Sequence, residues 1–304
     1  MSTHRSSPTT SNPDYFRIED DWEWDPSVEK DLSDNAFEEI RKYVQSAREM
    51  YDSGKPLFPR SVILDAAQQL KAKSDKIFLR GWDGQVKEYP YYRARGEETL
   101  IPILHFGAFE NRIKFAYIAG STYNPLSICW TNGFAQHPRH TLEQITDKFK
   151  MHEKSWREGD ICPLITESIC KMDPVPTKVI GLGLGTPDQC DGKGPFFQHA
   201  AIVTIAEVLK EKGGREAACM SFCQDPAYSS TDKELLEDLN VTVLESPMGF
   251  LEIDSNSIVV SISPNVPVKQ IVADDRSHWP AMMIWARIDS TEQEKEMYSP
   301  RHAL

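Results

Sequence analysis

The order of hydrophobic and polar positions divides the chain into two parts with different patterns. From residue 177 onward, short and nearly continuous apolar runs alternate with helical patterns. We expect strands at residues 179–180, 217–223, 241–244, 257–262 and 281–286, and helices at 196–212, around 235–236 and at 268–273. Apolar strands separated by helices are typical of a parallel sheet that is covered on both faces. The pattern therefore predicts an α/β fold, with a Rossmann-like, mostly parallel sheet and helices on both faces.

The first part of the chain mixes helices with strands that follow one another directly. We expect helices at 36–51, 61–73, 141–156 and 163–171, and strands at 77–82, 85–89, 100–106 and 113–118. The turn Asp83-Gly84 makes the first two strands a hairpin, and residues 124–139 have the composition of a loop. The chain then divides into a disordered tail at 1–14, an N-terminal α+β appendage at 15–140, the Rossmann-like domain at 141–290 and a C-terminal tail at 291–304.

Composition and charge narrow the choice of partners and compartment. The 304 residues carry a formal net charge of -12, which disfavours long contacts with nucleic acid or with anionic membranes. No apolar run approaches the roughly 20 residues that span a bilayer, and residues 1–13 lack the apolar stretch of a secretory signal. Six scattered cysteines without a Cys-x-x-Cys pair indicate reduced thiols. We therefore expect a cytosolic or nuclear protein that binds neither nucleic acid nor membrane.

The first chemical signal is the glycine-rich stretch after the first strand of the expected sheet. Gly181, Gly183 and Gly185 precede Thr186, and an apolar helical pattern begins at Phe196. Glycines let a ligand approach main-chain N–H groups, and the start of a helix attracts anions. The Gly-x-Gly-x-Gly spacing differs from that of dinucleotide enzymes and is closer to the loop of S-adenosylmethionine-dependent methyltransferases. The alternative is a turn that is rich in glycine only for close packing.

Ligands of such sheets bind beyond the carboxyl ends of the strands, which selects further candidates. Asp225 follows the second strand, where an acid either accepts hydrogen bonds from ribose hydroxyls or caps the next loop. Pro264 and Asn265 belong to a stiff loop after the fourth strand, and the amide of Asn265 can donate and accept. Gln198 shares the helix stripe that faces the sheet and should lie at the floor of the crevice. His199 lies off that stripe, so we expect it to be solvated or at the rim.

Three other features allow both a functional and a structural interpretation. Trp22 and Trp24 lie in an acidic run that suits either a partner-binding peptide or a strap docked on the protein's own surface. Cys162 precedes a proline, as in some haem-responsive proteins, but proline is also common at the start of a helix. His137 and His140 suit a metal pair or, more simply, a turn that leads into a helix. We favour the structural interpretation in each case and expect no metal site.

Several motifs, taken in order, resemble the SRR domain family, named for "sensitivity to red light reduced". They are Gly181-Leu-Gly-Leu-Gly185, Gln198, the run that begins Gln224-Asp225-Pro226, the strand at 240–244 and Ser263-Pro264-Asn265-Val266-Pro267. The resemblance covers about residues 156–287, and the appendage before it resembles those of fungal members. The family usually has Pro-His-Cys-Pro after strand four. Here Asn265 and Val266 replace the imidazole and the thiol.

The resemblance implies a regulatory protein of the cytoplasm and nucleus. Family members are tied to the circadian clock and light signalling, to microtubule stability and to haem metabolism, and no catalytic activity is established for them. The leading hypothesis is therefore a regulator that binds a small nucleotide-like ligand at the glycine loop. One alternative is an S-adenosylmethionine-dependent methyltransferase, with Asp225 on the ribose and Asn265 near the acceptor. Another is an interaction scaffold with a relic pocket, which binds partners through Trp22 and Trp24.

Overall fold

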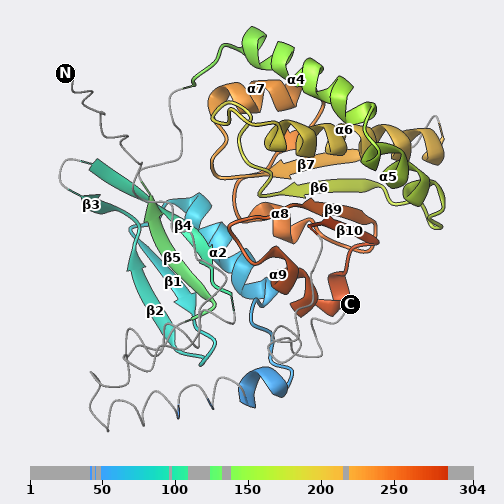
Figure 1. Ribbon diagram of the computed structural model, residues 1–304. Helices are drawn as coiled ribbons and strands as arrows, with labels where there is room; N and C mark the ends of the chain where they lie inside the picture. The colour runs from blue at the N-terminus through green and yellow to red at the C-terminus, as the bar shows by residue number, and fades with distance from the viewer. Residues whose placement is uncertain are drawn as a thin grey trace, which may run out of the picture.

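The computed structural model describes residues 42, 45, 49–95, 98–108, 124–131, 138–214 and 219–286 (Figure 1). The helices are α2 (Arg60–Ala72), α4 (Leu142–Arg157), α5 (Ile161–Cys170), α6 (Gly194–Gly213), α7 (Ser230–Asp238), α8 (Met248–Leu251), α9 (Val268–Asp274) and the 3-10 helix η2 (Arg276–His278). The strands are β1 (Lys76–Arg80), β2 (Val86–Pro90), β3 (Arg93–Arg95), β4 (Glu98–Phe106), β5 (Leu126–Thr131), β6 (Lys178–Leu182), β7 (Met220–Gln224), β8 (Thr242–Val243), β9 (Ser257–Ser261) and β10 (Met282–Trp285).

The last five strands form one parallel sheet in the order β10-β9-β6-β7-β8. Numbered along the chain, this is the 3-2-1-4-5 order of a Rossmann-like sheet, which confirms the predicted fold class. Gly181 in the central strand β6 pairs with Cys223 of β7 on one side and with Val260 of β9 on the other. The strand order reverses between β6 and β9, so their carboxyl ends form the switch point where ligands of this fold usually bind.

Alternate side chains of the sheet enter two separate cores. Val179 packs with Ile202 of α6 on the face that α5, α6 and α7 cover, and α4 packs outside α6 and α7 (Figure 1). Ile180 packs with Phe250 of α8 and Ile271 of α9 on the opposite face. Both β6 and β9 are buried at every position, which explains why their sequences are nearly continuous apolar runs.

The N-terminal region packs on the second face of the sheet. It contains the antiparallel hairpin β1-β2 and the antiparallel sheet β3-β4-β5. The ring of Phe106 in β4 lies 4.8 Å from the ring of Phe250 in α8, centroid to centroid. The guanidinium of Arg60 in α2 donates hydrogen bonds to the carbonyl oxygens of Phe250 and Ile253, at 3.2 and 3.4 Å. One apolar core therefore joins the N-terminal region to the parallel sheet.

One expected loop is a strand, so that prediction was wrong. β5 occupies part of the expected loop at 124–139 and pairs with β4, where Cys129 lies opposite Ile103. Leu126 and Ile128 alternate into the core, a short period-two pattern that suits a half-buried antiparallel strand. The expected strand at 113–118, most of the expected helix at 36–51 and both terminal tails lie outside the described residues.

Two helices begin at the polar residues that hydrogen-bond their first N–H groups. Thr141 caps α4 through a reciprocal pair with Gln144, and Ser229 caps α7 through a reciprocal pair with Asp232. Such boxes satisfy donors that a helix start leaves unpaired. Across the part of the chain that the structure describes, no helix has the length and apolar character to cross a membrane.

Candidate functional site

The glycine loop after β6 folds tightly, and the protein itself fills the space that its glycines leave. Gly183 and Gly185 have φ angles of 63° and 75°, in the left-handed region that favours glycine. A Cβ atom at Gly183 would lie 2.9 Å from Cβ of Pro264, and one at Gly181 would lie 2.5 Å from Cδ1 of Leu184. Conformation and close packing together account for glycine at these positions.

Two main-chain donors of this loop, at Gly183 and Gly185, are also occupied. The N–H of Gly183 donates to the carbonyl oxygen of Gln224 at 3.0 Å. The N–H of Gly185 donates to Oδ2 of Asp225 at 2.8 Å, and the N–H of Ala227 donates to Oδ1 at 2.9 Å. The contacts favour the packing interpretation of Gly183 and Gly185, while ligand binding at the loop stays a prediction.

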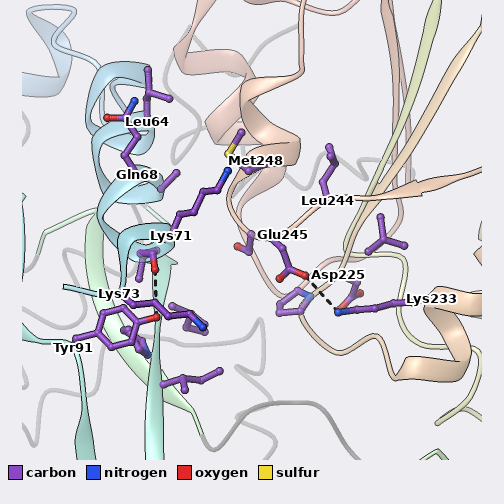
Figure 2. A pocket seen from close by; sticks show the side chains of 18 of the residues that line it. Leu64, Gln68, Lys71, Lys73, Tyr91, Asp225, Lys233, Leu244, Glu245 and Met248 are labelled. Carbon is purple, nitrogen blue, oxygen red and sulfur yellow. Dashed lines mark hydrogen bonds and ion pairs between the residues drawn. The ribbon is translucent and has the colours of Figure 1, made fainter. Parts of the chain in front are cut away.

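A cavity of about 870 Å³ lies beyond the carboxyl ends of β7 and β8, to one side of the β6–β9 switch point, and no residue of 181–186 lines it. Asp225 follows β7 and Glu245 follows β8 on one wall, while α2 and Tyr91 form the facing wall (Figure 2). Apolar lining comes from both sides: Leu64, Ala67, Leu70, Ile101, Ile103, Val243, Leu244 and Met248. Among the described residues that line the cavity, Asp225 alone belongs to the predicted ligand-binding set.

Asp225 is partly buried, and two effects act on the pKa of its carboxyl group in opposite directions. Burial raises the pKa of Asp225, and the hydrogen bonds from Ala227 and Gly185 act against that rise. A carboxylate has about four acceptor sites, so two internal hydrogen bonds leave capacity for the hydroxyl group of a ligand. Asp225 can therefore hold the loop and accept a ligand hydrogen bond at the same time.

The other predicted residues do not line this cavity. The hydroxyl of Thr186 donates to Oδ2 of Asp232, and Pro264 packs against Gly183. Asn265 is exposed in the loop after β9. Oε1 of Gln198 is buried without a hydrogen-bond partner among the described atoms. The structure thus brings Pro264 to the glycine loop and separates Asn265 from Asp225's cavity.

His199 is buried, so the expectation of a solvated or rim position was wrong. Only 1% of the residue is exposed, and Nε2 lies 2.7 Å from the hydroxyl of Tyr228. Nδ1 lies 2.6 Å from the carbonyl oxygen of Pro195, so Nδ1 donates and the Tyr228 hydroxyl donates to Nε2. Helix α6 is covered by α4 and α5 as well as by the sheet, and its buried face is wider than one stripe.

Burial sets the charge state of the side chains around His199. It lowers the pKa of His199 and raises the pKa of Tyr228 well above its ordinary value. Burial also raises the pKa of Cys223 to about 12. The imidazole, phenol and thiol are therefore all neutral near pH 7. The continuous apolar run of α6 was the sequence signal that could have indicated a buried histidine.

Asp188, which the sequence analysis did not single out, ties the segment before α4 to the glycine loop. It is fully buried and accepts hydrogen bonds from the N–H groups of Arg139, at 3.0 Å, and His140, at 2.8 Å. Burial alone would raise the pKa of Asp188, but these bonds outweigh it and the pKa is lowered. The N–H of Asp188 in turn donates to Oδ1 of Asp232 at 2.8 Å. His140 therefore has a structural partner.

The residues considered for haem or metal binding lie in ordinary structural surroundings where they are described. Cys162 is 8% exposed and belongs to an apolar cluster with Phe149 and Trp156. Within the described ranges, no three His, Cys, Asp or Glu side chains gather in a way that could hold a metal ion. His137, Trp22 and Trp24 lie outside those ranges.

Comparison with known families matches residues 162–303 to the SRR1 domain. The match begins inside α5 and includes all five strands of the parallel sheet. Helix α2 and strands β1 to β5 precede it and lie outside the matched domain. No curated protein and no solved structure shows a significant match to the chain.

Proposed function

Because residues 162–303 belong to the SRR1 domain family, we propose that this chain is a non-catalytic regulatory protein that binds a small nucleotide-like ligand. The ligand occupies the cavity beyond β7 and β8, and Asp225 accepts hydrogen bonds from its ribose hydroxyls. One observation carries the proposal. Asp225 follows the second strand of a 3-2-1-4-5 sheet and lines a cavity of about 870 Å³.

The position of Asp225 matches the chemistry of nucleoside recognition. In sheets of this order, an acid shortly after the second strand hydrogen-bonds the ribose of a bound nucleotide. The cavity volume falls within the range of about 300 to 1,000 Å³ that is usual for small-molecule sites. Apolar residues such as Leu244 and Met248 supply walls against which a base can pack.

In this proposal the glycine loop positions Asp225 instead of cradling phosphates. The N–H of Gly185 is bonded to the carboxylate, and the N–H of Gly183 is bonded to the carbonyl of Gln224. Because these two donors are occupied, they cannot also bind a cofactor. This disfavours an enzyme that binds its cofactor through the N–H groups of Gly183 and Gly185. Testing the chain for binding of S-adenosylmethionine, the cofactor of the methyltransferase alternative, distinguishes that alternative from the regulator.

Thermal-shift and calorimetric titrations of the full chain with nucleosides, nucleotides and S-adenosylmethionine test the proposal. We expect one nucleoside or nucleotide class to raise the melting temperature. Asp225→Asn should weaken its binding about tenfold, the size of losing one charged hydrogen bond. Asp191→Asn, at an exposed acid outside the cavity, is the matched control. The absence of any binding would overturn the proposal and favour a scaffold, and S-adenosylmethionine binding with methyl transfer would favour the methyltransferase.

A further inference from the structure

We infer that the N-terminal region supplies an anion-binding half of the cavity, so that its ligand is a nucleotide carrying at least one phosphate and not a nucleoside. The inference rests on the proposed function and adds to it the charge of the ligand and a role for residues outside the SRR1 domain. Lys71 and Lys73, at the end of α2, are the residues that bind the phosphate.

The cavity has two walls from two separate parts of the chain. Leu64, Lys71 and Tyr91 stand on one side, and Asp225 and Glu245 stand on the other (Figure 2). The residues of the first wall precede residue 162 in the sequence, and those of the second wall belong to the matched domain. The matched domain alone would therefore leave Asp225 facing an incomplete site.

The charge of the lining favours an anion. Three lysines and two carboxylates line the cavity, in a chain whose formal net charge is -12. Lys233 forms an ion pair with Glu245, with Nζ 3.4 Å from Oε1. Lys71 and Lys73 have no side-chain partner among the described residues, and both are exposed. Within the described part of the chain, Lys71 and Lys73 thus remain as unpaired cations at the α2 wall, opposite Asp225 (Figure 2).

The apolar part of the lining indicates what else the ligand carries. Ten large hydrophobic side chains are exposed among the described residues, and four of them line this cavity: Leu64, Tyr92, Ile101 and Met248. Exposed apolar surface that gathers at a cavity marks a binding site more often than scattered exposure does. A planar base covers such surface, and a phosphate reaches the lysines. A nucleotide has both groups in one molecule.

The C-terminal end of α2 does not itself attract a phosphate. A helix C-terminus carries partial negative charge, which by itself repels an anion. Lys71 and Lys73 must therefore provide the attraction through their own charges, at exposed positions where salt screens it. Binding of the phosphate should weaken as salt concentration rises, whereas binding of the nucleoside part should not.

Calorimetric titrations of the full chain with each ribonucleoside and its 5′-monophosphate test the inference. We expect the monophosphate to bind about tenfold more tightly than its nucleoside, the combined effect of two exposed charge contacts. The double variant Lys71→Met/Lys73→Met should remove this difference and leave the nucleoside affinity unchanged. Lys150→Met/Lys210→Met changes the net charge equally at exposed sites outside the cavity and should retain the difference.

The outcomes separate this inference from the proposed function. Equal affinity of nucleoside and monophosphate for the wild-type protein would overturn the lysine site and leave nucleoside binding at Asp225 in place. An equal loss in both double variants would also overturn it, because the effect would then come from net charge. Failure of every nucleoside and nucleotide to bind would overturn the proposed function, and the inference with it.

Discussion

Oδ2 of Asp225 accepts a hydrogen bond from the N–H of Gly185 at 2.8 Å, which joins the end of β7 to the loop after β6. Oδ1 of the same carboxylate accepts from the N–H of Ala227 and holds the next turn. The acid that lines the cavity is thus also a structural part of the glycine loop. A substitution at Asp225 therefore changes loop stability and ligand binding together, and the two effects must be measured separately.

Asp225→Ala should destabilise the free protein because it leaves two main-chain N–H groups without their acceptor. We expect a loss of about 2 kcal/mol in the free energy of unfolding, measured by urea denaturation without ligand. Asp225→Asn keeps one acceptor oxygen and should lose about half as much. Wild-type stability in the alanine variant would show that the two hydrogen bonds contribute nothing to the fold.

Gly183→Ala should be more damaging than the same change at another glycine with positive φ. The added Cβ at Gly183 would lie 2.9 Å from Pro264, while at Gly84, with φ 87°, it would meet nothing within 4 Å. Gly84→Ala therefore measures the backbone cost alone, about 1 kcal/mol. Gly183→Ala adds the contact with Pro264, for a total of about 3 kcal/mol in chemical denaturation. An equal loss of unfolding free energy in the two variants would mean that the loop of Pro264 moves aside without a measurable energetic penalty.

The centre of the parallel sheet could be predicted because two of its strands are buried on both faces. β6 and β9 have no position that faces water, so their apolar runs are visible in the sequence without knowledge of their neighbours. β7 is buried at three of its five positions, which was enough to place Asp225 at the end of the second strand. Where burial depends on one face only, as at Leu126 and Ile128 of β5, the pattern is short and the strand was missed.

The cavity could not be predicted because it belongs to no single segment. Its walls join Lys71 and Tyr91 to Asp225 and Glu245, residues more than a hundred positions apart in the chain. Periodicity reports which face of an element is buried, but not which distant element covers it. His199 was misplaced for a related reason, because Tyr228, which follows β7, lies against it.

Asp188→Asn should weaken the attachment of the segment before α4 and reduce stability above about pH 4. The hydrogen bonds from Arg139 and His140 lower the folded-state pKa of Asp188 below its ordinary value of 3.8. The ionised carboxylate therefore stabilises the fold fully above that ordinary value, and the contribution is lost as pH falls through the lowered pKa. We expect a loss of about 2 kcal/mol at pH 7 and a smaller one near pH 3, measured by urea denaturation at both values. A pH-independent loss would contradict the assignment.

His199→Gln should reduce the fall in the free energy of unfolding that occurs as the pH drops below 6.5. Burial lowers the folded-state pKa of His199 below its ordinary value of 6.5, although the carbonyl of Pro195 and the carboxylates of Asp232 and Asp225 act against the shift. Below pH 6.5 the unfolded chain then binds a proton that the folded protein does not, so the fold loses up to about 1.4 kcal/mol per pH unit. Above that pH the two states bind equally and the effect vanishes.

Denaturant midpoints of the wild-type protein and two variants between pH 5 and pH 8 measure this effect. The wild-type curve should fall below pH 6.5, and the His199→Gln curve should fall less steeply, since the remaining histidines are common to both. Tyr228→Phe removes the donor to Nε2 but keeps the buried imidazole, so it should be less stable at every pH and retain most of the slope. If His199→Gln kept the full wild-type slope, the imidazole of His199 would not be the group that the folded protein keeps neutral.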